Sequence, residues 1–114
     1  MSYVDGFVAA VPVNNKQAYL EHAQIAAEIF KKHGALSVVE CWGDDVPDGE
    51  LNSLNSAVMR KPDEAVVFSW VVWESKEARD SGWGNIMDDP DMPQNMPFDG
   101  KRIIYGGFQK LLEA

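Results

Sequence analysis

The sequence predicts an α+β domain in which two helices cover one face of a four-stranded antiparallel sheet. Segments with the composition of strands and segments with helical periodicity follow in the order strand, helix, strand, strand, helix, strand. The 114 residues suit one domain, and the hydrophobic fraction of 46% is enough for one core. The element order is that of the ferredoxin-like βαββαβ sandwich, so we expect residues 1–114 to form one such domain.

Four segments rich in β-branched and aromatic residues are predicted to be strands. They span residues 3–13, 35–42, 65–73 and 102–108. The third is apolar at nearly every position, which is typical of a central strand. Residues 51–60 allow two interpretations, a short strand around Val58 or irregular cover of the sheet.

The first helix is predicted to start at Asn14, a residue that can cap a helix, and to end before Gly34. The cationic residues Lys31 and Lys32 followed by His33 are typical of a helix that ends in a left-handed glycine cap. Its apolar face combines two adjacent stripes at helical spacing: Ala18, His22, Ile25 and Ile29, with Tyr19, Ala23, Ala26 and Phe30.

The second helix is predicted to start after the capping residue Ser75 and to reach about Met87. Gly82 and Gly84 each cost about 1 kcal/mol of helix propensity relative to alanine. We therefore expect this helix to fray or bend around Trp83.

The segment that leads into the last strand contains three prolines, so residues 88–100 are predicted to form a loop. Within the last strand, Gly106 and Gly107 predict a bulge or the close approach of another backbone. A ligand contact at these glycines is the less favoured interpretation.

The chain is acidic, with ten basic and eighteen acidic side chains and a formal net charge of −8. This charge repels phosphate backbones, so nucleic acid is not expected as a partner. Solubility is the simpler explanation of the acidity, and a preference for cationic ligands or metals is the alternative.

Other features point to a cytoplasmic protein without a membrane partner. No apolar run approaches the length of about 18 residues that a membrane span requires, and the first residues lack the basic leader of a signal peptide. Cys41 is the only cysteine, which excludes an intramolecular disulfide and fits a reducing compartment. We interpret it as a small hydrophobic residue rather than as a nucleophile.

The predicted strands are apolar on both faces, although the two helices can cover only one. In the first strand, Tyr3 and Phe7 share one face while Val4 and Val8 share the other. In the third strand, Phe68 and Trp70 share one face while Val67 and Val71 share the other. A second copy related by a twofold axis is the simplest cover for the other face. We therefore expect a homodimer whose sheets face each other around a cavity or a dry core.

The candidate metal-binding motifs do not have the residue spacing that a metal site requires. A calcium loop needs a carboxylate at its twelfth position, but the acidic loop that starts at Asp44 has Asn55 there. The two histidines, His22 and His33, lie about 16 Å apart along one helix, too far to share a metal. We expect neither a metal nor a cofactor, and the sequence shows no nucleotide-binding or hydrolase motif.

Two carboxylates inside strands, Asp5 and Glu40, are the best candidates for a functional site. Each is either paired, with Arg102, Lys101 or a tyrosine hydroxyl, or faces a cavity with a perturbed pKa. His22 is more simply explained as a core or interface histidine than as an acid or base. The predicted lining of a ligand pocket is Tyr3, Asp5, Phe7, His22, Glu40, Trp42, Trp70 and Tyr105.

Four strings follow one another along the chain: Tyr3-Val-Asp-Gly-Phe7; Val39-Glu-Cys-Trp42 with Asp44-Asp-Val-Pro-Asp-Gly49; Val67-Phe-Ser-Trp70; and Met96-Pro-Phe-Asp-Gly-Lys-Arg102 through Tyr105-Gly-Gly-Phe108. They resemble the YbaA-like family of small bacterial proteins, a domain of unknown function (number 1428). The resemblance implies a dimeric α+β barrel, in a superfamily that includes cofactor-free monooxygenases. Since the family has no established activity, it implies no catalytic residue.

Two functions fit these observations. One is a binder of a small organic molecule, or an enzyme with monooxygenase-like chemistry, whose pocket lies between sheet and helices or between two sheets. The other is a non-catalytic structural or regulatory dimer with a filled interface. A cavity of about 300 Å³ or more with a strand carboxylate in its wall favours the first.

Overall fold

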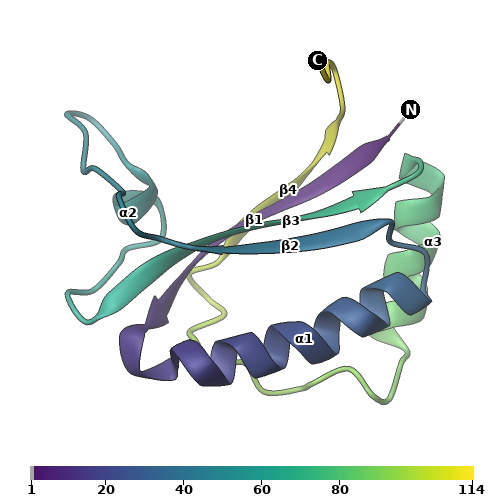
Figure 1. Ribbon diagram of the computed structural model, residues 1–114, viewed down its shortest axis with the longest axis horizontal. Coiled ribbons are helices and arrows are strands. Elements are labelled where there is room, and N and C mark those ends of the chain that lie inside the picture. The colour runs from purple at the N-terminus through teal and green to yellow at the C-terminus, as the bar shows by residue number, and fades with distance from the viewer. Residues whose placement is uncertain (1) are drawn as a thin grey trace.

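An antiparallel sheet of four strands forms the middle of the computed structural model, which describes residues 2–114 (Figure 1). The strands are β1 (Tyr3–Pro12), β2 (Ser37–Trp42), β3 (Glu64–Trp73) and β4 (Ile104–Gln109). They lie in the order β2-β3-β1-β4, so β3 is a central strand, as predicted. This α+β arrangement is compatible with the predicted ferredoxin-like order of elements.

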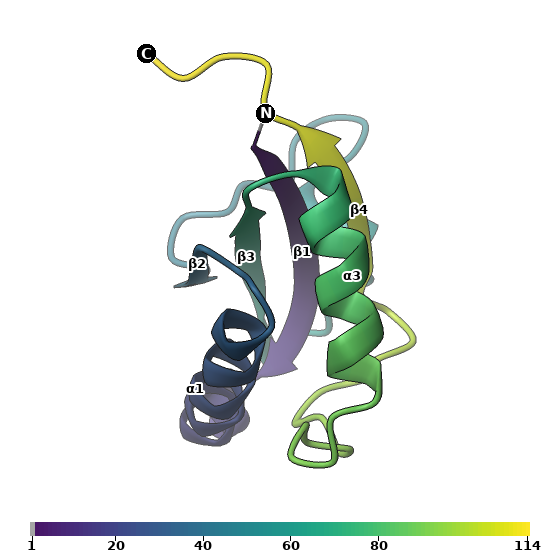
Figure 2. The same ribbon diagram turned by 90° about the vertical axis from the view of Figure 1, so that its right-hand side faces the viewer.

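Two helices, α1 (Lys16–Lys32) and α3 (Lys76–Met87), cover one face of the sheet (Figure 2). The Ser75 side chain caps α3 as predicted, because it accepts a hydrogen bond from the backbone N–H of Ala78. The buried residues of α1 are Ala23, Ala26, Ile29 and Phe30. Ala18 and Ile25 belong to the predicted apolar face but are exposed, Ile25 by 52%, because the buried side of the helix is centred on Ala23, Ala26 and Phe30.

The start of α1 differs from the prediction, and its end agrees with it. A 3-10 turn, Val13–Asn15, follows β1 directly, and the backbone N–H of Lys16 donates to the carbonyl oxygen of Val13. No side chain caps this helix, so the prediction that Asn14 caps it is wrong. Gly34 has a φ of +110°, which confirms the left-handed cap at the end of α1.

Helix α3 runs without a break through both of its glycines, so it does not fray around Trp83. Trp73, fully buried at the end of β3, explains Gly82: a Cβ atom at this position would overlap the Trp73 ring. Glycine allows the helix to approach the sheet closely, and the packing of the indole offsets the weak helix propensity.

Residues 43–63 cross the opposite face of the sheet and cover one end of it (Figure 1). They contain the short helix α2 (Leu54–Ala57), which Ser53 caps, and the fully buried Val58. Val58 packs in a cluster with Val8, Ala10 and Val66. Of the two interpretations of residues 51–60, irregular cover is therefore correct and a short strand is wrong.

Strand β4 pairs with β1 in continuous register through Gly106 and Gly107, so the predicted bulge is wrong. A Cβ atom on Gly107 would collide with the side chains of Tyr3 and Arg79. Side chains, rather than another backbone, make the close approach at this glycine.

The rest of the face opposite α1 and α3 is apolar and uncovered in the structure. We call this surface the open sheet face; it consists of Val39, Phe68, Trp70, Val72, Ile104 and Phe108. Phe68 is 46% exposed and Phe108 62%. Between residues 2 and 114, no helix has both the length and the apolar character needed to cross a lipid bilayer.

Candidate functional site

A cavity of about 370 Å³ lies between the helix-covered face of the sheet, α1, α3 and the segment 88–103. We call it the sheet–helix cavity. Most of its wall is apolar and includes Phe7, Phe30, Val38, Val71, Trp83 and Ile86. The segment before β4 and the end of α3 add Met87, Met92, Met96 and Phe98. This volume lies in the range of about 300–1,000 Å³ that is typical of small-molecule sites.

A small group of polar side chains lies in this apolar wall. Glu40 of β2 and Ser69 of β3 are register partners, so both side chains point toward the helices. Tyr19 reaches them from the first turns of α1, and its hydroxyl donates a hydrogen bond of 2.6 Å to Oε1 of Glu40. His22 lies almost one turn further along α1 and also lines the cavity.

The surroundings of these groups change their proton affinities. Burial raises the pKa of Glu40 above its usual value of 4.5, and the hydroxyls of Tyr19 and Ser69 oppose part of the rise. Burial and the nearby Glu40 carboxylate raise the pKa of Tyr19, so its hydroxyl keeps its proton. Burial lowers the pKa of His22 below 6.5, which favours a neutral imidazole at neutral pH.

A second hollow of about 300 Å³ adjoins the sheet–helix cavity and shares Tyr19 and Glu40 with it. Trp42 and Lys16 belong to the wall of this hollow, where Lys16 Nζ lies 5.3 Å from the centre of the Trp42 ring. Glu40 is exposed at the junction of the two spaces. A ligand can therefore reach its carboxylate.

The segment 88–103 forms the outer wall of the cavity, and ion pairs hold it at its start. Asp89 is buried, and its Oδ2 atom lies 2.8 Å from His33 Nε2 and 3.1 Å from Lys32 Nζ. These contacts, chiefly the hydrogen bond with His33, lower the pKa of Asp89 to about 2. The wall is thereby joined to the end of α1.

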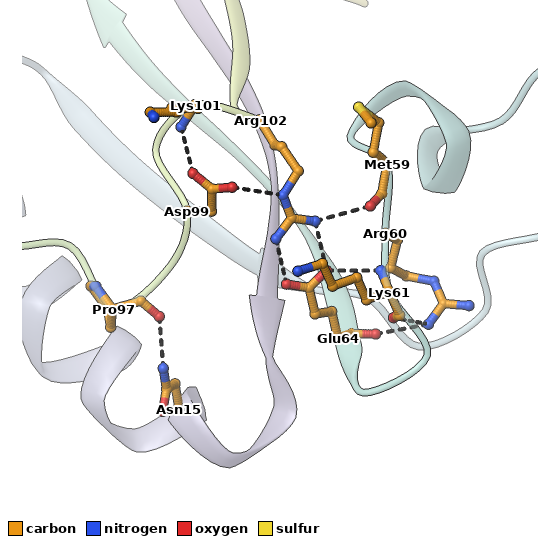
Figure 3. A network of polar contacts seen from close by, with 9 residues as sticks. All are labelled: Asn15, Met59, Arg60, Lys61, Glu64, Pro97, Asp99, Lys101 and Arg102. Carbon is orange, nitrogen blue, oxygen red and sulfur yellow. Dashed lines mark hydrogen bonds and ion pairs between the residues drawn. The ribbon is translucent and has the colours of Figure 1, made fainter.

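A second anchor holds the other end of this segment (Figure 3). Arg102 donates two hydrogen bonds, of 2.8 and 2.6 Å, to the carboxylate of Glu64 and one of 3.1 Å to Asp99. The hydrogen bonds from Arg102 lower the pKa of Glu64 to about 2. Between the two anchors, the Asn15 side chain donates to the carbonyl oxygen of Pro97 at 2.9 Å.

Asp5, the other strand carboxylate, lies outside the cavity wall and is fully engaged. The indole N–H groups of Trp73 and Trp83 each donate to its Oδ2 atom at 2.9 Å. Arg79 of α3 places Nε and Nη2 at 3.0 Å from its Oδ1 atom. This carboxylate joins α3 to the sheet and has a structural role.

Of the two strand carboxylates, Glu40 has a partner of a predicted kind and Asp5 does not. Asp5 does not pair with Arg102 or Lys101, because the turn before β4 carries these residues to the opposite end of the sheet from Asp5. Glu40 pairs with a tyrosine hydroxyl, which was one of the predicted alternatives.

The structure separates the eight residues predicted to line a pocket. Three lie in the wall of the sheet–helix cavity, namely Phe7, His22 and Glu40, and Trp42 lies in the adjoining hollow. The other four lie elsewhere: Tyr3 and Asp5 are buried beside Arg79, Trp70 lies on the open sheet face, and Tyr105 is 76% exposed.

Sequence reasoning did not identify Tyr19, Ser69 or the methionines as site residues. Ser69 carried a usable signal, because it is the only polar residue in the apolar run 65–73. Tyr19 was placed in the apolar stripe of its helix, where it could not be distinguished from a core residue. The methionines follow no periodic pattern, since their segment is irregular.

The potential metal ligands of the described chain, including the cysteine, do not gather at one site. Within residues 2–114, no three His, Cys, Asp or Glu side chains form a group that could hold a metal ion. Cys41 is a free, exposed cysteine on β2.

Known proteins with similar sequences match this chain over nearly its whole length. The chain matches the family model described as "Protein of unknown function (DUF1428)" over residues 2–100. It is 52% identical over 116 residues to the uncharacterized protein YbaA of Escherichia coli K12, a match that covers 99% of both chains. The YbaA proteins of Escherichia coli O157:H7 and Shigella flexneri are similar to the same extent. These matches confirm the resemblance to the YbaA-like proteins, and the chain belongs to the DUF1428 family.

Proposed function

We propose that this protein binds a small organic molecule in the sheet–helix cavity, where Glu40 is the main polar contact. The observation that carries this proposal is an apolar cavity of about 370 Å³ with a strand carboxylate in its wall. Partial desolvation in this wall disfavours the ionised form of Glu40, although its side chain stays accessible at the junction with the adjoining hollow. No cation compensates Glu40 within the described residues, so its presence is better explained by a ligand than by folding.

The same arrangement supports proton abstraction as a reaction at this site. A carboxyl group with a raised pKa is a better general base near neutral pH than an ordinary one. The superfamily to which the resemblance points includes cofactor-free monooxygenases, and removal of a proton from the substrate is the step of such a reaction that this site suits. Glu40 is the group placed to take that proton, and the Tyr19 hydroxyl can stabilise the charge that develops.

We further propose that the ferredoxin-like sandwich pairs with a second copy through the open sheet face and forms a dimeric α+β barrel in the cytoplasm. Large apolar side chains on this surface, such as Phe68 and Phe108, are typical of the core of a protein interface. A structural or regulatory dimer without a ligand is the alternative function. It uses the same face but gives no role to the carboxylate in the sheet–helix cavity.

A thermal-shift screen of metabolites against the full chain tests the binding proposal. A ligand at 100 times its dissociation constant should add about 2.7 kcal/mol to the free energy of unfolding. The Ala27→Phe variant, which places a ring in the cavity wall, should lose the response, since Ala27 lines the cavity and is half-buried. Ala18→Phe, at an exposed position of the same helix, should keep it.

Two results would count against this function. A screen of broad metabolite classes, including aromatic and quinone-like compounds, that finds no stabilising compound would favour the non-catalytic dimer. A compound that stabilises the Ala27→Phe variant as much as the unmodified protein would place its binding site outside the sheet–helix cavity.

A further inference from the structure

We propose that the ligand of the sheet–helix cavity is an amphipathic amine, in which an apolar body carries one protonated nitrogen that pairs with Glu40. This inference rests on the proposed function and adds the charge of the ligand to it.

The other carboxylates in the strands are each neutralised by a cation of the chain itself. Asp5 pairs with Arg79 at 3.0 Å, and Glu64 pairs with Arg102 at 2.6 Å. Glu40, on the same sheet, has a hydroxyl as its partner and no ion pair within residues 2–114. A carboxylate in an apolar wall is stabilised when a cation completes the pair, and a ligand amine can supply that cation.

The charges in the wall disfavour an anionic ligand. Neither a lysine nor an arginine lines the part of the sheet–helix cavity that the structure describes. The nearest basic residue in the adjoining hollow, Lys16, lies over the ring of Trp42. A carboxylate or phosphate in this cavity would face the charge of Glu40 without compensation, which is unfavourable at low dielectric.

Aromatic rings border the carboxylate and suit a cation. The ring of Tyr19 lies 5.8 Å from that of Phe98 and 6.4 Å from that of Trp42, measured between ring centres. The faces of such rings attract an ammonium group that has lost part of its water. The adaptable methionine side chains of the outer wall suit the apolar body of the ligand. The net charge of −8 attracts cations at longer range.

Isothermal titration of the full chain at neutral pH with three matched probes tests this inference. The probes share one phenylpropyl body and differ in their end group: 3-phenylpropylamine, 3-phenylpropan-1-ol and 3-phenylpropanoate. The amine is expected to bind at least about tenfold more tightly than the alcohol, as one charge-assisted hydrogen bond allows. The carboxylate is expected to bind more weakly than the alcohol.

Two variants show whether Glu40 is the cause of this preference. Glu40→Gln keeps an oxygen acceptor for the Tyr19 hydroxyl but removes the charge, so it should lower amine affinity about tenfold and leave alcohol affinity within about twofold. Glu50→Gln makes the same charge change at an exposed loop position and should leave both affinities unchanged.

The inference is overturned if the alcohol or the carboxylate binds as tightly as the amine, or if Glu40→Gln leaves amine affinity unchanged. Binding of the alcohol or the carboxylate leaves the proposed binding of a small molecule intact, whereas an unchanged Glu40→Gln variant also removes Glu40 as its main polar contact. Failure of the amine to bind at millimolar concentration also overturns the inference. The wider metabolite screen then decides separately whether the cavity has a ligand at all.

Discussion

Asp5 and Glu40 point from strands of one sheet toward the same pair of helices, yet their surroundings differ. Two indole N–H groups and the guanidinium of Arg79 surround Asp5, so its charge is compensated by the chain. Glu40 has one hydroxyl partner and an opening to a cavity. We infer that the first carboxylate serves the fold and that the second serves a ligand.

This difference at the scale of one residue predicts how Glu40 affects stability. Because burial raises its pKa, the folded protein binds more protons than the unfolded chain just above pH 4.5, and stability falls as pH rises through the folded pKa. Glu40→Gln should therefore be at least as stable as the unmodified protein at pH 7. Its advantage in the free energy of urea unfolding should be larger at pH 7 than at pH 4.

A matched variant controls for the change in net charge. Glu50→Gln should stay within about 0.5 kcal/mol of the unmodified protein at both pH values, as is usual for an exposed position. If Glu40→Gln is clearly less stable than this control at pH 7, Glu40 supports the fold, and the ligand-facing role is wrong.

Both carboxylates could be identified from the sequence, because a charged residue in an apolar strand departs from the pattern around it. The hydrogen-bond partners of these carboxylates could not be identified from the sequence. Tyr19 and Glu40 are 21 residues apart, and Asp5 and Arg79 are 74 residues apart. Such pairs depend on the orientation of α1 and α3 across the sheet, and the periodicity of the sequence does not reveal this orientation.

At the scale of elements, Gly82 and Gly84 of α3 look alike in sequence but differ in their surroundings. A Cβ atom at Gly82 would overlap the buried Trp73 ring, whereas Gly84 has open space around it. Gly82→Ala should lower the free energy of unfolding by about 1–3 kcal/mol through overpacking. Gly84→Ala should raise it by up to about 1 kcal/mol through helix propensity. Equal effects of the two changes in urea unfolding would contradict this account of α3.

The segment 88–103 should loosen in acid, because its anchors need ionised carboxylates. Contacts lower the pKa of Asp89 and of Glu64 to about 2, so their stabilisation is complete above pH 4.5 and is lost as pH falls toward 2. Hydrogen–deuterium exchange of this segment, corrected for intrinsic rates, should therefore increase between pH 4.5 and pH 2. Unchanged protection at pH 2 would show that these ion pairs do not hold the wall.

Helix ends and strands were predictable where capping residues or apolar runs determine them. Ser75 at the start of α3 and Gly34 after α1 mark real helix ends, and the apolar runs form strands. The start of α1 and the continuity of α3 were not predicted. There, a 3-10 turn and the packing of Trp73 outweigh local preference.

At the scale of the whole molecule, the open sheet face predicts self-association. Phe68 is 46% exposed near the middle of this surface and contacts Trp70, with 5.7 Å between ring centres. Sedimentation equilibrium at micromolar concentration should show a dimer. Phe68→Lys should shift it toward the monomer, because an interface would have to desolvate the added charge.

Leu36→Lys provides the control, since Leu36 is 58% exposed and precedes β2 outside the open sheet face. This variant should remain dimeric. A monomeric unmodified protein under the same conditions would contradict the proposed dimer, although it would not affect the cavity on the other side of the sheet.

The most direct test of the central claim, that the sheet–helix cavity holds a ligand, is ¹³C-methyl methionine NMR during titration with a stabilising compound. Met87, Met92 and Met96 line the cavity, whereas Met59 lies outside it, in the segment on the opposite face of the sheet. The signals of the three cavity methionines should shift in a saturable manner while that of Met59 stays in place. Saturable binding that leaves all three unchanged would contradict it.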